Sequence, residues 1–180
     1  MPTSHFTQIP QVIEAVIDVN PDSILEIGIG CGKWSILCRE YLEVWDRYFN
    51  AWGERKIVMD GIEIHDLYSD SPGWIGYNAV HIGDATEIVP TLGHYDLIML
   101  IDVLEHFEFS DGFALLQSCL DKSDAVLVAI PSVYFPTVEV WDNPHEIHKC
   151  AWAIADFELL GAVNVYRNAD SLVVTVRREQ

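Results

Sequence analysis

The sequence predicts an α/β domain in which helices cover both faces of a mostly parallel, doubly wound sheet that ends in an antiparallel hairpin. Short apolar runs alternate with segments of helical periodicity, which is typical of parallel strands joined by right-handed crossovers. The segment Glu26–Gly32 carries three alternate glycines between the first apolar run and the next helical segment. Two apolar runs at residues 163–167 and 172–176 are separated by four polar or small residues, which allows a hairpin.

The first predicted element is an amphipathic helix over residues 8–19, because apolar residues recur there at spacings of three and four. Thr7 is placed to cap this helix, and the turn Asn20–Asp22 ends it. Five apolar strands follow, at residues 23–27, 57–64, 78–82, 95–101 and 125–130. The continuous apolar character of the last two indicates burial on both faces of a parallel sheet.

Further helices are expected between and after these strands, at residues 34–45, 86–91, 110–120 (with Ser110 as the N-cap) and 152–160. The segment 46–56 mixes aromatic and polar residues, and its sequence predicts no particular structure. Residues 66–76 are rich in Ser, Asp, Pro and Gly, so they are expected to form mostly loop in place of a crossover helix. Residues 131–150 are expected to form a second long loop.

The length of 180 residues suits a single domain, with an N-terminal helix in residues 1–21 and a core in residues 22–180. Hydrophobic residues make up 50% of the chain, which indicates a globular protein. Residues 1–11 show neither a basic region nor an apolar one, so no signal peptide is expected and the cytoplasm is the predicted location. The four cysteines form no C-x-x-C pair and are expected to be reduced thiols.

The strongly acidic composition bears on the partners. The formal net charge is -18, which repels phosphate backbones and anionic membrane surfaces. We therefore expect neither a nucleic-acid nor a membrane partner. No feature of the sequence indicates an oligomeric state.

Acidic residues recur where the predicted parallel strands end. Glu26 lies at the first turn, and Glu63, Asp84 and Asp102 follow or end the next three strands. Ligands of an open parallel sheet bind beyond the carboxyl ends of its strands. Four acidic residues at that edge, beside a glycine turn, indicate a ligand rich in hydroxyl and amino groups. A carboxylate at the position of Glu63 is suited to both hydroxyls of a ribose, and Asp84 with the N–H of Ala85 is suited to an adenine.

These motifs together resemble those of class I S-adenosylmethionine-dependent methyltransferases. The resemblance rests on four stretches in the family's order, and it covers about residues 22 to 176. They are the glycine loop Glu26–Gly32, Glu63, the turn Gly83–Ala85, and Asp96–Phe107 with its D-V-L-E-H sequence. The family has a Rossmann-like fold whose last strand is antiparallel, in agreement with the fold class predicted from the elements.

The resemblance implies an enzyme that transfers a methyl group from S-adenosylmethionine to a small-molecule acceptor by in-line displacement. Gly28, Gly30 and Gly32 would let the backbone approach the methionine part of the cofactor, which Glu26 would orient. Glu63 would hold the ribose, and Asp84 with Ala85 the adenine. Asp102 and Val103 would border the methionine moiety and the sulfonium.

Histidines are the candidates for acceptor chemistry. His106, by resemblance, lies near the acceptor side and is the first candidate for a general base. His145 and His148, with Glu146 between them, fall in the loop after the fifth strand and could supply a base, bind a metal with His106, or line an acceptor site. Their His-x-x-His spacing lacks further ligands, so no metal site is predicted. Trp74, Tyr77 and Trp141 are aromatic residues that either shape an acceptor pocket or pack in the core.

Two other function classes remain open at this point. A nicotinamide-dependent oxidoreductase would need G-x-G-x-x-G, but Lys33 stands at the position of its third glycine and no catalytic domain follows. A non-catalytic protein that binds the cofactor or a partner protein is compatible with the short chain, which shows no evident substrate-covering domain.

Overall fold

A computed structural model describes residues 3–47, 55–139 and 143–178. The segment 46–56, for which the sequence predicts no structure, and Trp141 therefore lie partly or wholly outside the described residues. The helices are α1 (Ile9–Val19), α2 (Lys33–Arg39), α3 (Ala85–Ile88), α4 (Phe109–Asp121) and α5 (Ile154–Glu158). The strands are β1 (Ser23–Ile27), β2 (Val58–Glu63), β3 (Ala79–Ile82), β4 (Tyr95–Ile101), β5 (Ser123–Pro131), β6 (Ala162–Arg167) and β7 (Ser171–Arg177).

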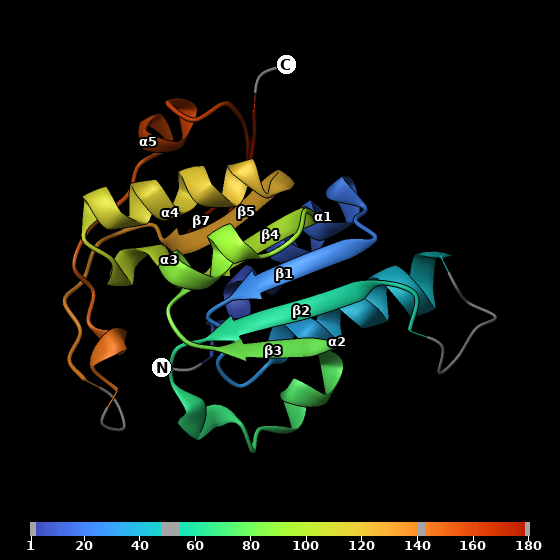
Figure 1. Cartoon of the computed structure of the whole chain (residues 1–180). Coiled ribbons are helices and arrows are strands. Elements are labelled where there is room, and N and C mark those ends of the chain that lie inside the picture. The colour runs from blue at the N-terminus through green and yellow to red at the C-terminus, as the bar shows by residue number, and fades with distance from the viewer. Residues whose placement is uncertain (1–2, 48–54, 140–142, 179–180) are drawn as a thin grey trace.

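The strands form one seven-stranded sheet in the order β3-β2-β1-β4-β5-β7-β6 (Figure 1). The first five are parallel to one another, and β7 runs antiparallel to both β5 and β6. The predicted fold class is therefore confirmed, including the terminal hairpin. The strand order reverses between β1 and β4, and ligands of such sheets bind at this switch point.

Two cores lie on the two faces of the sheet. Alternate residues of each buried strand face opposite sides, so Leu97 and Met99 of β4 pack with α1 and α2 while Ile98 and Leu100 pack with α3 and α4. Figure 1 shows α3 and α4 in front of the sheet and α1 and α2 behind it. This arrangement explains the continuous apolar runs in the central strands, at residues 97–101 of β4 and 125–130 of β5.

Several predicted helix boundaries were wrong. A 3₁₀ turn, η1 (Phe6–Gln8), precedes α1, so Thr7 lies inside that turn and the N-cap is Gln8. Glu108 is the N-cap of α4, and Ser110 lies in its first turn. The last helix, α5, is shorter than expected and does not include Trp152, whose indole instead donates to the carbonyl of Leu104 at 3.2 Å. The ends of these helices depend on tertiary contacts, which the spacing of apolar residues in the sequence does not report.

The segment 66–76 contains more structure than a loop. It forms two 3₁₀ helices, η3 (Asp66–Tyr68) and η4 (Pro72–Gly76), between β2 and β3. Beyond α2 the chain continues as a π-helix, η2 (Glu40–Arg47). Among the described residues, no helix has the length and apolar character needed to cross a membrane.

Candidate functional site

The glycine loop after β1 turns tightly at the carboxyl edge of the sheet. Gly28, Gly30 and Gly32 have φ values of 72°, 49° and 78°, in the left-handed region that glycine enters without steric cost. A Cβ on Gly28 would lie 2.6 Å from Cγ2 of Val103, and one on Gly32 would lie 2.5 Å from the carbonyl carbon of Gly73. Conformation and close packing therefore both require glycine at these two positions.

Glu63, the last residue of β2, is bound to the glycine loop. Its Oε2 accepts the N–H of Gly30 at 2.8 Å, and its Oε1 accepts the N–H of His65 at 3.0 Å. The side chain is buried, and burial raises the pKa of its carboxyl group while these backbone hydrogen bonds lower it. An ionised carboxylate has about four acceptor positions, so at least one remains for a ligand in the adjoining cavity after these hydrogen bonds and a further one from the backbone of Ile64.

Glu26 lies one residue before the end of β1 rather than in the turn. It is 1% exposed and accepts a 2.6 Å hydrogen bond from the hydroxyl of Tyr77. Burial raises the pKa of Glu26 to about 8, with the Tyr77 hydrogen bond opposing the shift and the nearby Glu63 adding to it. A cation bound beside this carboxylate would favour its ionised form.

Asp102 follows β4 with a φ of 55°, a left-handed conformation that is uncommon for a residue with a side chain. Its N–H donates to the carbonyl of Ala129 at 2.7 Å, and its Oδ2 accepts from Nε2 of Gln8 at 2.6 Å. The turn directs Val103 against Gly28. The backbone at Asp102 thus couples the end of β4 to the glycine loop.

Asp84 caps α3, as a turn-stabilising aspartate would. Its Oδ1 accepts from both the N–H and the hydroxyl of Thr86, at 2.8 and 2.7 Å. Its other oxygen, Oδ2, accepts no hydrogen bond from the described residues. Ala85 occupies the first position of α3, where a backbone N–H has no partner within the helix.

One cavity of about 600 Å³ unites these groups. Most of the predicted cofactor residues line it, together with two of the predicted histidines; they are Glu26, Gly28, Gly30, Glu63, Asp84, Ala85, Asp102, Val103, His106 and His145. Gly32 and His148 are not part of its lining. Gly32 instead packs against Gly73 and shapes the loop from behind.

The short helix η4 supports the glycine loop, a role that the sequence does not reveal. The indole of Trp74 donates to the carbonyl of Gly30 at 2.7 Å, and the hydroxyl of Ser71 donates to the carbonyl of Cys31 at 2.7 Å. Trp74 and Tyr77 therefore hold the loop and Glu26, and neither lines the cavity. Ser71 and Gly73, two of the residues that indicated a loop, make this close backbone contact, since a Cβ on Gly73 would collide with the carbonyl oxygen of Cys31.

The N-terminal segment also contributes to the cavity, which the sequence analysis missed. Ser4 lines it, and the ammonium group of Lys33 donates to the Ser4 carbonyl. Burial lowers the pKa of Lys33, while the neighbouring Asp102 raises it. Gln8 is fully buried and reaches Asp102 from the same segment. The one sign of this contact in the sequence was Gln8, a polar residue on the apolar face of the helix predicted over residues 8–19.

The histidines differ in their positions. His106 and His145 lie on the cavity wall, whereas His148 lies beside His106 with 5.0 Å between ring centroids. Burial lowers the pKa of His106 to about 4, and the neighbouring His148 lowers it further in the same direction. His106 is therefore neutral at pH 7 and a weaker base than the sequence suggested. All four cysteines are free thiols, as expected.

The sequence matches no protein-family model and no curated protein. Solved structures do match. The N-terminal domain of EvdMO1, determined with SAH (S-adenosylhomocysteine) and D-fucose, has a TM-score of 0.65 at 16% identity and covers 98% of this chain and 85% of its own. Magnesium protoporphyrin IX methyltransferase (ChlM) from Synechocystis PCC 6803, with bound SAM, has a TM-score of 0.63 at 12% identity over 96% of this chain and 78% of its own.

A third similar structure is a proposed O-methyltransferase from Nostoc punctiforme PCC 73102, with a TM-score of 0.65 at 14% identity. The match covers 96% of this chain and 57% of the chain in that structure. At these identities the likeness concerns the fold. Together with the strand order, it shows that this chain has the fold of the class I S-adenosylmethionine-dependent methyltransferases.

Proposed function

We propose that this protein is an S-adenosylmethionine-dependent methyltransferase that acts on a small-molecule acceptor. The observation that carries the proposal is the convergence of four strand-end carboxylates on one cavity around a left-handed glycine loop. Glu26, Glu63, Asp84 and Asp102 all line that cavity. The similar folds of EvdMO1 and ChlM, whose structures contain SAH or SAM, support the same cofactor here.

The residues present fit this cofactor. The cavity of about 600 Å³ is within the range of small-molecule sites. Its acidic wall suits a ligand that carries an ammonium and a sulfonium group. Glu63 is held by two backbone N–H groups with acceptor positions to spare, which suits adjacent ribose hydroxyls. Asp84 keeps Oδ2 for an adenine amine while its Oδ1 caps α3.

The protein's part in the reaction is to bind and orient. S-adenosylmethionine, when bound, supplies a methyl group activated by the sulfonium, and transfer requires alignment more than acid–base chemistry. Glu26 would orient the ammonium group, and the glycine backbone of Gly28 and Gly30 would admit the methionine chain. Asp102 and Val103 would border the reacting centre and exclude water from it.

The acceptor side is formed by His106 and His145 and by the residues after β5. Both histidines line the cavity, so an acceptor held there would contact them. The size of the cavity and the net charge of -18 favour a small molecule over a nucleic acid.

The proposal is tested by titrating the purified protein with S-adenosylhomocysteine and, separately, with NAD in a calorimeter. We expect saturable one-site binding of S-adenosylhomocysteine and none of NAD; the reverse result would refute the proposal. Transfer is then measured with radiolabelled S-adenosylmethionine across a panel of hydroxyl, carboxyl and amine acceptors. Tight cofactor binding without any methylated product would instead support a non-catalytic binding protein.

A further inference from the structure

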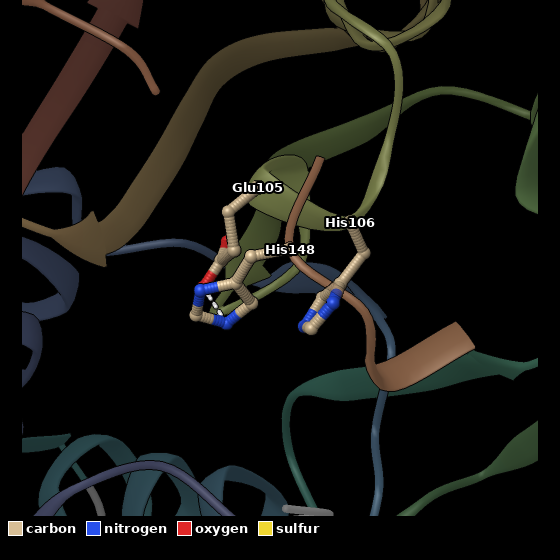
Figure 2. A group of neighbouring side chains, drawn as sticks. All are labelled: Glu105, His106 and His148. Carbon is tan, nitrogen blue, oxygen red and sulfur yellow. Dashed lines mark ion pairs between the residues drawn. The ribbon is translucent and has the colours of Figure 1, made fainter. Parts of the chain in front are cut away.

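A cluster of two imidazoles and one carboxylate lies behind the cavity wall. Figure 2 shows Glu105 and His106, from the short helix η6 (Leu104–His106) after β4, beside His148 from the loop after β5. One ligand atom from each side chain lies within 4.8 Å of the other two. Nε2 of His148 is 4.0 Å from Oε1 of Glu105.

The backbone holds the two segments of this cluster together. The N–H of Lys149 donates to the carbonyl of Glu105 at 2.7 Å, and the N–H of His148 donates to the hydroxyl of Thr137 at 2.7 Å. Thr137 in turn donates to the carbonyl of Glu146 at 2.7 Å. The loop after β5 is thus built so that His148 faces Glu105.

Both histidines present the same protonation pattern. Nδ1 of His148 lies 2.9 Å from the carbonyl oxygen of Phe135, and Nδ1 of His106 lies 3.3 Å from that of Ile147. A carbonyl oxygen only accepts, so each ring carries its proton on Nδ1 and keeps a lone pair on Nε2. Metal-binding histidines characteristically donate their second ring N–H to a carbonyl or carboxylate in this way.

The carboxylate of Glu105 is buried without a hydrogen-bond partner in the described part of the chain, an observation that is independent of the distances within the cluster. The residue is 3% exposed, and neither of its carboxylate oxygens has a hydrogen-bond partner among the described residues. A buried carboxyl without partners is strongly destabilising unless a proton or a cation compensates it.

We propose that Glu105, His106 and His148 bind a divalent transition-metal ion of the zinc class. Two imidazoles and one carboxylate are a ligand set of zinc and iron(II) sites, whereas Mg²⁺ and Ca²⁺ prefer oxygen ligands throughout. Zinc binds such atoms at about 2.0–2.2 Å. Each of the three ligand atoms would therefore need to move toward the ion by about 1 Å or less.

The position of the ion relates it to the cavity. His106 lines the cavity and the other two ligands do not, so the ion lies at the acceptor-side wall. Its remaining coordination positions are left to water or to an oxygen of an acceptor. This proposal departs from the sequence-based expectation of no metal, because Glu105 becomes a candidate ligand only through the fold.

The experiment uses untagged, full-length protein freed of metal with a chelator. Titration with Zn²⁺ by calorimetry and with Co²⁺ by visible absorption should show one site per chain, with Co²⁺ d–d bands of a four- or five-coordinate site. Mg²⁺ at the same concentration should not compete. Neither readout needs a cofactor or an acceptor, and S-adenosylhomocysteine binding by the same metal-free protein tests the proposed function separately.

Matched variants assign the ligands. Glu105→Gln and His148→Ala should each lower Zn²⁺ affinity by more than about 100-fold, since outer-shell changes alone cost 10- to 100-fold. His145→Ala, which alters a cavity histidine outside the cluster, and His94→Ala, which alters an exposed one paired with Asp124, should leave it unchanged. Glu105→Gln keeps the side chain's shape, so its metal-free form should melt no lower than the wild type while its metal-induced rise in Tm is lost. Absence of one-site binding, or unchanged affinity in Glu105→Gln, would overturn the proposal.

Discussion

The N–H of Gly30 donates a 2.8 Å hydrogen bond to Oε2 of Glu63, which joins the glycine loop to the last residue of the neighbouring strand. The same carboxylate therefore positions the loop and faces the cavity. A ligand that binds Glu63 would meet a loop whose conformation that residue already fixes. Binding then requires little rearrangement of the backbone.

The first prediction concerns Glu63→Ala. The change removes the acceptor for the ribose and leaves the N–H groups of Gly30 and His65 without their partner. We expect S-adenosylhomocysteine affinity to fall by about 1–3 kcal/mol, the scale of hydrogen bonds to charged groups. Calorimetry measures the change. Glu14→Ala, on the exposed face of α1, is the control and should bind normally; equal affinity in a folded Glu63→Ala protein would remove the ribose assignment.

The second prediction concerns the contact between Gly28 and Val103. In Gly28→Ala the new Cβ would lie 2.6 Å from Val103, on a backbone whose φ of 72° already disfavours a side chain by about 1–2 kcal/mol. We expect a folded protein that is less stable by a few kcal/mol and binds S-adenosylhomocysteine at least about tenfold more weakly.

Adding Val103→Ala to Gly28→Ala should restore part of the stability, because it removes the clash but not the conformational strain. Urea denaturation of the four proteins in this cycle measures the coupling. Gly93→Ala is the control, since a Cβ there meets nothing within 4 Å. Strictly additive effects of the two changes would contradict the contact.

Local sequence signals predicted most of the residues that the structure brings to one cavity, because these residues lie in short motifs at strand ends. The spacing of Gly28, Gly30 and Gly32 and the acidic residues after successive strands require only the alternation of elements to be placed at one edge. The partners of these residues come from far along the chain. Tyr77 reaches Glu26, and Gln8 reaches Asp102, through packing that no local pattern encodes. The same reason hid the grouping of Glu105 with His148.

The third prediction concerns Trp74, which was open to interpretation as a pocket residue and proved to hold the glycine loop. Trp74→Phe keeps an aromatic ring but removes the indole N–H that donates to Gly30 at 2.7 Å. We expect the free energy of S-adenosylhomocysteine binding to weaken by about 0.5–1.5 kcal/mol, because the hydrogen bond that holds the Gly30 carbonyl in place is lost. Calorimetry measures this change. Tyr166→Phe removes a comparable hydrogen bond, to Asp18 on the surface, and should leave binding unchanged. An unaltered affinity in Trp74→Phe would show that the loop keeps its conformation without this contact.

The fourth prediction is a pH dependence of stability that arises from Glu26. Burial raises its pKa from the ordinary 4.5 to about 8, with Tyr77 and Lys33 opposing the shift and Glu63 adding to it. Because the folded state holds this proton more tightly than the unfolded state, Glu26 contributes stability that is fully present below about pH 4.5 and is lost as the pH rises to about 8.

In Glu26→Gln the side chain stays neutral and its amide oxygen still accepts from Tyr77. The unfolding free energy of the wild type should therefore fall relative to that of Glu26→Gln across this range, by an amount on the order of a few kcal/mol. Urea denaturation of both proteins at pH 5, 6.5 and 8 measures the difference, which cancels the other titrating groups. Parallel curves for the two proteins would mean that Glu26 is ionised throughout and already has a compensating cation in the free protein.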